Sequence, residues 1–255
     1  MRDLIFEVAH VFFTYPGGSV ALCDVSFSVR AGERIAILGA NGSGKSTLLH
    51  LLDGLHFADC GSVRAFGVTL SEESLETPPF SREFRRNVSF LFQNSDAQLF
   101  CARVDEELAF GPLQLRLSDA DVERRVTDVL ALLRIEHLCE RPPQMLSAGE
   151  QKKVALASLL TCGPRVLLLD EPSAGLDPRT REWLAEFLDL LHRNGVTLVI
   201  ASHDLDFVAQ TTDRAIVLAE DHSAVRDCAT AEALADAELL ASVNLISAAR
   251  VAARR

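Results

Sequence analysis

The chain has 255 residues and a formal net charge of -11, with 25 Lys and Arg against 36 Asp and Glu. The acidic balance argues against nucleic acid as the main partner, because binding to a phosphate backbone needs a basic face. No run approaches 18 apolar residues and acidic residues lie near the start, so we expect no membrane span, no signal peptide and a cytosolic chain. The six cysteines lack C-x-x-C spacing, which predicts reduced thiols packed as small apolar side chains.

The first third of the chain reads as short strands. Apolar or alternating runs predict strands at residues 4–13, 25–29, 34–38, 61–68 and 88–92, with a turn at Pro16-Gly17-Gly18. Residues 71–86 are charged and contain Pro78-Pro79, so we expect a surface excursion there.

From about residue 96 to residue 160 the pattern becomes helical. Residues 121–133 have apolar side chains at three- and four-residue spacing, and Ser118 or Asp119 can cap that helix. Strands are then predicted at residues 166–169, 196–200 and 215–218, alternating with helices at 179–193 and 205–210. Buried strands that alternate with helices predict a parallel α/β sheet, with the helical stretch as an insert.

A phosphate-binding loop follows the third predicted strand. The segment Gly39-Ala40-Asn41-Gly42-Ser43-Gly44-Lys45-Ser46 fits G-x-x-x-x-G-K-[ST], and a helix beginning with Thr47 comes next. Glycines let the backbone N–H groups point inward, and the helix start adds positive potential for phosphate. Lys45 would neutralise the β- and γ-phosphates, and the Ser46 hydroxyl would ligate Mg²⁺. The alternative is a chance glycine-rich turn.

Two acidic residues end a later buried strand. Asp170-Glu171 follows four apolar residues, and the carboxyl edge of a parallel sheet is where such folds bind ligands. We expect Asp170 to hold Mg²⁺ and Glu171 to orient or deprotonate the attacking water. Without the loop, a structural pair bridging to Arg165 would be an alternative. Together the two motifs predict magnesium-dependent nucleotide hydrolysis.

The segment Leu146-Ser147-Ala148-Gly149-Glu150 resembles the L-S-G-G-Q or L-S-G-G-E signature of ATP-binding-cassette ATPases. Ser147 can cap a helix, and a capped helix start with a small residue at Gly149 can bind an anion, although an ordinary N-cap is the simpler interpretation of the segment alone. Ala148 replaces the first glycine of the pair. A left-handed backbone there would cost about 1 kcal/mol, whereas a helical one would be neutral, and we expect activity to survive.

The resemblance implies further site residues. Gln93 matches the loop that senses Mg²⁺ and the membrane partner, and His203 matches the switch residue at the γ-phosphate. Asp177 lies in the segment that matches the dimer-crossing loop, and Tyr15 matches the aromatic that stacks on adenine. In this family two cassettes, identical or paralogous, face each other head to tail. ATP then lies between the phosphate loop of one chain and Ser147, Gly149 and Glu150 of the other.

The family also implies the architecture: a P-loop nucleotide-hydrolase parallel sheet with an N-terminal antiparallel β subdomain and an inserted helical subdomain. We expect a cassette domain at residues 1–227, with the helical insert at about 96–162. A short helical extension would occupy residues 228–255. Its arginines at 250, 254 and 255 form a basic end that is either membrane-facing or simply solvated.

Phe92-Gln93-Asn94-Ser95-Asp96-Ala97-Gln98-Leu99-Phe100 resembles the F-Q-N-P-D-D-Q-L-F pattern of energy-coupling-factor transporter ATPases, with departures at Ser95 and Ala97. Residues 105–112 are similar to the segment that follows it in cobalt and nickel members. This stretch contains four acidic residues: Asp96, Asp105, Glu106 and Glu107. Their side chains would either meet basic helices of a membrane subunit or simply form a solvated helix start.

The branch implies an ATPase bound peripherally at the cytoplasmic face of the membrane. It would drive uptake of cobalt, nickel or another micronutrient such as biotin, with an integral coupling subunit and a substrate-binding membrane subunit. The alternatives are a soluble cassette ATPase of a non-transport process and a nucleotide-gated scaffold without turnover.

Overall fold

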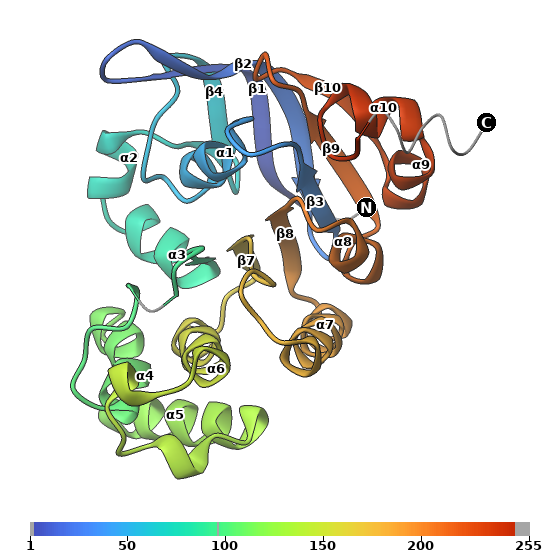
Figure 1. Cartoon of the computed structure of the whole chain (residues 1–255). Helices are drawn as coiled ribbons and strands as arrows, with labels where there is room; N and C mark the ends of the chain where they lie inside the picture. The colour runs from blue at the N-terminus through green and yellow to red at the C-terminus, as the bar shows by residue number, and fades with distance from the viewer. Residues whose placement is uncertain (1–2, 96, 248–255) are drawn as a thin grey trace.

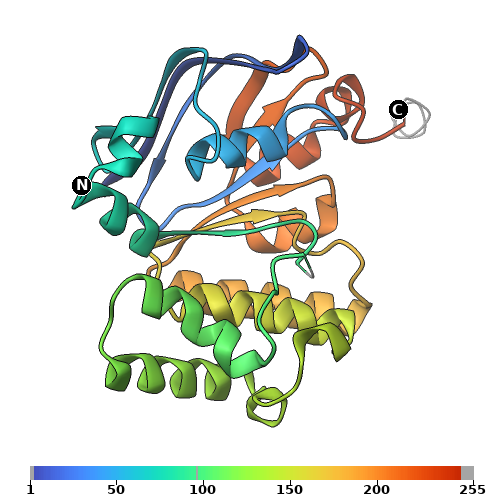
Figure 2. The ribbon, with the colours of Figure 1, turned by 90° about the vertical axis from the view of Figure 1, so that its left-hand side faces the viewer.

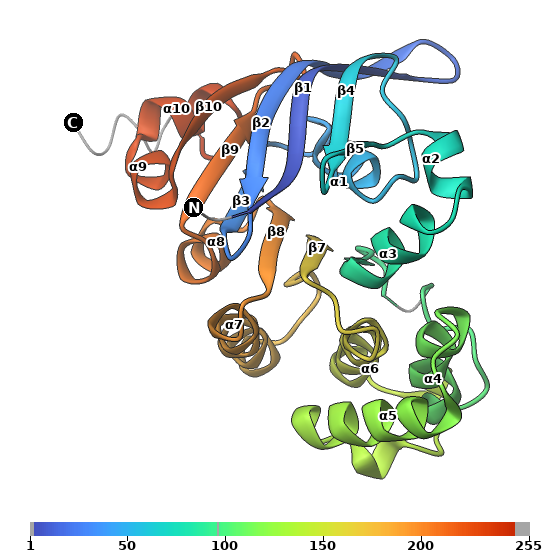
Figure 3. The ribbon, with the colours of Figure 1, turned by 180° about the vertical axis from the view of Figure 1, so that it is seen from behind.

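The computed structural model describes residues 3–95 and 97–247. It contains two sheets, and the first is antiparallel with strand order β2-β1-β4-β5 (Figures 1 and 3). Its strands are β1 (Leu4–Tyr15), β2 (Ser19–Arg30), β4 (Cys60–Ala65) and β5 (Val68–Thr69). Alternate residues of β1, such as Phe6 and Val8, are buried, which is the period-two pattern of a sheet with one covered face.

The second sheet has six strands in the order β10-β9-β3-β8-β7-β6, and all neighbours are parallel except β9 and β10. The strands are β3 (Arg34–Leu38), β6 (Val88–Leu91), β7 (Val166–Asp170), β8 (Thr197–Ser202), β9 (Arg214–Leu218) and β10 (Ala224–Ala229). The central strands are buried along their whole length, as both covered faces of a parallel sheet require. The predicted α/β class with a parallel core and an antiparallel β part is confirmed.

Helices cover both faces of the parallel sheet. Helix α1 (Lys45–Leu52) lies between the two sheets and shares one core with them, while α6 (Ala148–Leu160), α7 (Pro178–Arg193) and α8 (Leu205–Thr211) lie on the other face (Figure 2). Helices α4 (Val104–Gln114) and α5 (Asp119–Leu133) stand beyond α6. Short 3₁₀ turns at Glu136–Leu138 and Pro143–Met145 lead into α6. Ser118 caps α5 through the Asp121 N–H, as one of the two predicted capping residues.

Residues 71–86 lie at the surface as predicted, with Phe84 as the one buried residue. The structure adds that they form two short helices, α2 (Glu72–Glu76) and α3 (Phe80–Asn87). Phe84 is fully buried in the core beneath α1, so the charged composition concealed one apolar anchor. Cys60 is exposed rather than packed, although all six cysteines are unpaired.

At the C-terminal end the structure adds a strand. Strand β10 pairs antiparallel with β9, and Arg214 on β9 holds Asp227 on β10 through two charged hydrogen bonds of 2.7 and 2.6 Å. Helices α9 (Thr230–Ala235) and α10 (Ala237–Ser242) follow, and Ala233 of α9 and Val243 after α10 are buried in a small core with β3, β9 and α8. The predicted basic end at residues 250, 254 and 255 lies outside the described residues.

A buried carboxyl at the end of α1 predicts a pH effect on stability. Asp53 is 7% exposed at the C-terminus of α1, and burial raises its pKa to about 7 although Arg85 donates to it at 3.4 Å. Because the folded state then binds the proton more tightly than the unfolded state, stability falls as pH rises from about 4 to 7.

We expect Asp53→Asn to abolish this loss of stability with rising pH. The loss in the unaltered chain is on the order of a few kcal/mol, since one pKa unit corresponds to about 1.4 kcal/mol. Urea unfolding of both chains between pH 4 and pH 8 measures this. If the free energy of unfolding depends on pH equally in the two chains, Asp53 is not the group responsible.

Candidate active site

The parallel strands end at one edge of the sheet, and the predicted phosphate-site residues gather there. The phosphate loop follows β3, Glu171 follows β7 and His203 follows β8. Gly44 has a φ of 104° and an added Cβ would collide with the Ala21 carbonyl, so glycine is required by both backbone and space. Lys45 begins α1, which puts the helix N-terminus against the loop.

Lys45 is 6% exposed, and its ammonium group donates to the carbonyls of Gly39 and Ala40 at 2.8 and 3.0 Å. Its Nζ also lies 3.9 Å from Glu171 Oε1. Burial lowers the pKa of Lys45, while Glu171 and Asp170 act in the opposite direction. A phosphate group at this position would strengthen the charged form in the same way as these carboxylates.

Asp170 fits a metal-binding role. It is buried at the end of β7, and its Oδ1 has no hydrogen-bond partner among the described residues. Burial raises the pKa of Asp170, and a hydrogen bond with the Ser46 side chain partly offsets that effect. An orphaned buried carboxylate oxygen beside a hydroxyl is the oxygen donor set that Mg²⁺ prefers.

Glu171 is held from several sides. Its Oε2 accepts from the Ser202 hydroxyl at 2.9 Å, and its Oε1 accepts from the His203 N–H at 3.1 Å. The Nδ1 atom of His203 lies 2.7 Å from the same Oε1. Glu171 also has a φ of 43°, an uncommon backbone for a residue with a side chain. The carboxylate is therefore fixed beside Lys45 of the phosphate loop by the residues that end β8 and follow it.

A cavity of about 440 Å³ brings these groups together. Its lining combines predicted residues with a few others: Tyr15, Ser19, Val20, Ala21, Asn41, Gly42, Gly44, Lys45, Ser46, Thr47, Gln93, Glu171, His203 and His222. The Tyr15 hydroxyl lies 3.0 Å from the Thr47 hydroxyl, and its ring packs edge-on against Phe13. His222 is a lining residue that no sequence motif indicated.

Gln93 connects this cavity to a second one of about 460 Å³ that also contains Ser46 and Asp170. Gln98 fixes the segment after β6, because its amide donates to the Phe90 carbonyl at 3.2 Å and accepts from the Phe92 N–H at 3.3 Å. Gln98 belongs to the glutamine-loop motif, but its positioning role was not predicted.

The signature residues line a separate cavity of about 380 Å³. It contains Ser147, Gly149, Glu150 and Asp177, and it shares no residue with the phosphate-loop cavity. Ser147 caps α6 as predicted, since its hydroxyl accepts from the Glu150 N–H at 3.4 Å. The Glu150 carboxylate accepts in return from the Ser147 N–H at 2.8 Å.

The same cavity joins α6 to α7. An added Cβ at Gly149 would lie 3.2 Å from the Thr180 hydroxyl, so a small residue is needed where the two helices approach. Asp177 caps α7, and hydrogen bonds from Thr180 are the main reason that its pKa is lowered. The structure therefore brings the four predicted signature-face residues together, away from Lys45.

Ala148 is the first residue of α6 and does not have a positive φ. Residue 148 therefore has the helical backbone of the two alternatives considered, and the alanine methyl group causes no backbone strain there. We expect Ala148→Gly to leave ATP turnover within about twofold and to lower stability by less than about 1 kcal/mol. Steady-state ATPase assays and urea unfolding test this, and a large rise in turnover would show that the methyl group obstructs the site.

The predicted acidic face is present only in part, because Glu106 is exposed in the first turn of α4 whereas Glu107 is not. Glu107 is 4% exposed, and its carboxylate accepts from the N–H groups of Phe100 and Cys101 at 2.9 and 2.8 Å. Asp105 forms an ion pair with Arg103 at 2.6 Å, and Asp96 lies outside the described residues. The segment also exposes apolar side chains: Phe100 is 61% exposed and stacks edge-on with Phe110 at 4.8 Å.

Two features are absent from the described residues 3–95 and 97–247. No helix in this part is long and apolar enough to cross a membrane. No group of three or more His, Cys, Asp or Glu side chains within it is arranged to hold a metal ion.

The fold and the phosphate-loop cavity define a P-loop ATPase. The family model described as ABC transporter matches residues 22–174, and the chain belongs to this family. It is 46% identical to the nickel import ATP-binding protein NikO of Rhodobacter capsulatus over 94% of this chain and 95% of the relative. It is 40% identical to the energy-coupling factor transporter ATP-binding protein EcfA of Carboxydothermus hydrogenoformans, over 85% and 78% of the two chains.

Solved structures agree with this assignment. CbiO1 of Clostridium perfringens, described as part of the ABC transporter complex CbiONQ, matches with a TM-score of 0.81 and 32% identity over 99% of both chains. The ATP-binding cassette MJ0796, described as a dimeric post-hydrolysis state with ADP and Pi, matches with a TM-score of 0.78 and 26% identity. That match covers 89% of this chain and 99% of the other. The chain is thus an ABC ATPase.

Proposed function

We propose that this ATPase is the motor subunit of an energy-coupling-factor importer for nickel, cobalt or another micronutrient such as biotin. The observation that carries the motor role is the arrangement of Lys45, Glu171 and His203 around one cavity beside the buried Asp170. Such a cavity can hold a nucleotide triphosphate and place a carboxylate and an imidazole at its reacting end.

Within that proposal, Ser46, Asp170 and Gln93 hold Mg²⁺, which neutralises charge on the phosphates when it is bound. Lys45 leaves the loop carbonyls to bind the β- and γ-phosphates. Glu171 accepts a proton from the attacking water, and Ser202 keeps its carboxylate oriented through the 2.9 Å hydrogen bond. Tyr15 supplies an aromatic ring for the adenine base.

The separation of the two cavities supports a dimer. Because Ser147 and Gly149 lie away from Lys45, a nucleotide in the phosphate loop reaches such residues only on a second cassette, identical or paralogous. The solved cassette MJ0796, which is described as dimeric with ADP and Pi, is consistent with this arrangement. Closure on ATP and reopening after hydrolysis would then drive the transporter.

The names NikO, EcfA and CbiO1 among similar proteins support the importer branch. We place the docking face for the membrane coupling subunit at Phe100 and Phe110, which pack edge-on, and Glu107 fixes the loop that carries Phe100 through its amides. An exposed aromatic pair of this kind suits a helix of an integral subunit, and the chain would sit peripherally at the cytoplasmic face of the membrane.

Co-purification of the tagged chain from membranes, followed by metal-uptake assays, tests the transport role. We expect Phe100→Ala to reduce uptake and co-purification of integral subunits at least tenfold while the isolated chain keeps its ATP turnover. Met145→Ala, which removes a side chain 72% exposed elsewhere, is the matched control. Robust turnover with no co-purifying integral protein, in the wild-type chain, would contradict transport.

A further inference from the structure

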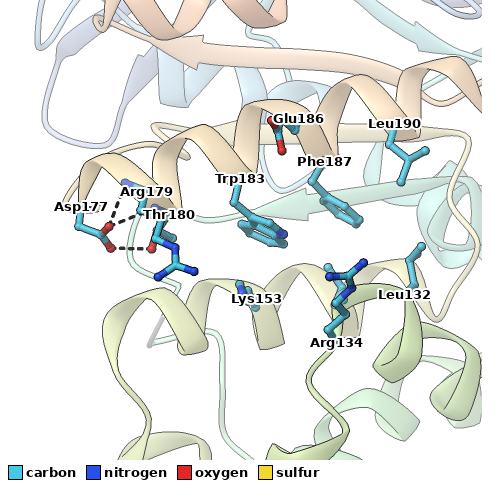
Figure 4. A pocket seen from close by; sticks show the side chains of 11 residues that line it. Leu132, Arg134, Lys153, Asp177, Arg179, Thr180, Trp183, Glu186, Phe187 and Leu190 are labelled. Carbon is cyan, nitrogen blue, oxygen red and sulfur yellow. Dashed lines mark hydrogen bonds between the residues drawn. The ribbon is translucent and has the colours of Figure 1, made fainter.

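A cavity larger than the nucleotide site lies elsewhere in the described part of the chain. It is a groove of about 820 Å³ between α7 on one side and α5 and α6 on the other (Figure 4). Trp183 and Phe187 project from α7 toward Lys153 on α6 and Arg134 at the end of α5. We call this the α5–α7 groove.

Three cations line the groove: Arg134, Lys153 and Arg179. None of them forms an ion pair with a carboxylate among residues 3–95 and 97–247. By contrast, Arg34 is bound by Asp213 through two charged hydrogen bonds of 2.8 and 2.7 Å. In a chain with 36 acidic residues, three unpaired cations in one groove indicate a site for an anion.

The acidic side chains of the groove, Asp177 and Glu186, leave one of its three positive charges unbalanced. Asp177 accepts hydrogen bonds from the N–H groups of Arg179 and Thr180 and from the Thr180 hydroxyl, so its oxygens are occupied as a helix cap. Glu186 is the other acidic residue of the lining, and it forms no ion pair within the described ranges. The groove keeps an excess of positive charge.

The rest of the groove is apolar. The rings of Trp183 and Phe187 stack at 5.4 Å with an interplanar angle of 10°, and the Lys153 ammonium lies 4.6 Å from the Trp183 ring centroid. Leu132 and Leu190 are 49% and 44% exposed at the end away from Arg179 (Figure 4). A ligand that fills the groove therefore needs an anionic end and an apolar or aromatic body.

We propose that the α5–α7 groove binds a phosphorylated small molecule with an apolar or aromatic body. A guanidinium group can donate two parallel hydrogen bonds to the oxygens of one phosphate. A cavity of several hundred Å³ is large enough for a small organic molecule. The phosphate lies beside Arg179 and Lys153 at one end of the groove, and the body packs against Phe187 and the two leucines toward the other end, where Arg134 also lies (Figure 4). Because Lys153, Asp177 and Thr180 also line the signature cavity, this ligand would bind next to the dimer-facing surface.

The test uses phenyl phosphate as the probe, with inorganic phosphate and benzyl alcohol as its two halves. Trp183 is the only tryptophan of the chain, so its fluorescence reports on the groove directly. The Lys45→Ala chain is used to keep phosphate out of the phosphate loop, and calorimetry measures binding in parallel. Since no ATP turnover is involved, the result is independent of the proposed motor function.

We expect saturable binding of phenyl phosphate that is at least tenfold tighter than that of either half. Arg179→Gln and Lys153→Gln should each weaken it at least tenfold, whereas Arg82→Gln, on exposed helix α3, should not change it. Absence of saturable binding, equal affinity for benzyl alcohol, or unchanged affinity in both groove variants would overturn the proposal. So would preference for a leucine-containing acidic peptide, which would indicate a docking groove for a protein segment.

Discussion

Replacing Glu171 with glutamine is expected to lower ATP turnover by about 10³-fold while ATP binding persists, because a positioned general base contributes about 10² to 10⁴ to such rates. Glutamine keeps the shape and can still contact Ser202 and His203, whose hydrogen bonds to the carboxylate are 2.9 and 3.1 Å. The variant loses only the ability to accept a proton from water. ATP should therefore accumulate on the protein and hold the dimer closed.

Steady-state turnover, ATP affinity and size-exclusion chromatography with ATP measure these three effects. Glu182→Gln, which changes an exposed carboxylate on α7, is the matched control and should behave like the unaltered chain. Turnover within a few-fold of normal in Glu171→Gln would remove this residue from the role of base.

Replacing Lys45 with alanine is expected to weaken ATP binding by at least about 10²-fold. Charged hydrogen bonds are worth about 1.5 to 3 kcal/mol each, and in the proposed complex Lys45 would bind two phosphate groups. The 6% exposure of its side chain means that water cannot replace the lost charge efficiently.

Fluorescent-nucleotide titration measures the affinity, and a thermal unfolding curve confirms that the variant is folded. Arg82→Ala removes one positive charge from the surface of α3 and serves as the control. Normal affinity in Lys45→Ala would contradict the assignment of the phosphate loop.

The elements that the sequence predicted well are those with a single dominant signal. The buried strand at residues 34–38 and the helix at 179–193 have clear apolar patterns, and the structure places them at Arg34–Leu38 and Pro178–Arg193. Helix α3 was missed because Phe84 is its only buried residue and its charged side chains remain in water. Strand β10 was missed because its side chains are mostly exposed and it depends on pairing with β9.

The residues of the candidate site also fall into those that a local sequence pattern indicates and those that it does not. The phosphate loop, Asp170-Glu171 and the signature segment are contiguous motifs, so the sequence alone is enough to name their residues. Ser202, Gln98 and His222 depend on contacts between distant strands or loops, which no local pattern reveals. Glu107 was misinterpreted because a carboxylate in a run of acids resembles a solvated helix start, whereas here it binds two loop amides.

Mixing two inactive variants tests the central claim that each nucleotide site is shared by two cassettes. One chain carries Glu171→Gln and the other carries Ser147→Arg, and each alone should have little turnover. In a mixed dimer one site contains both changes and the other contains neither, so we predict that ATP turnover returns to a substantial fraction of that of the unaltered chain. If the mixture stays as inactive as its components while the unaltered chain turns over ATP, each site is complete within one chain and the account is wrong.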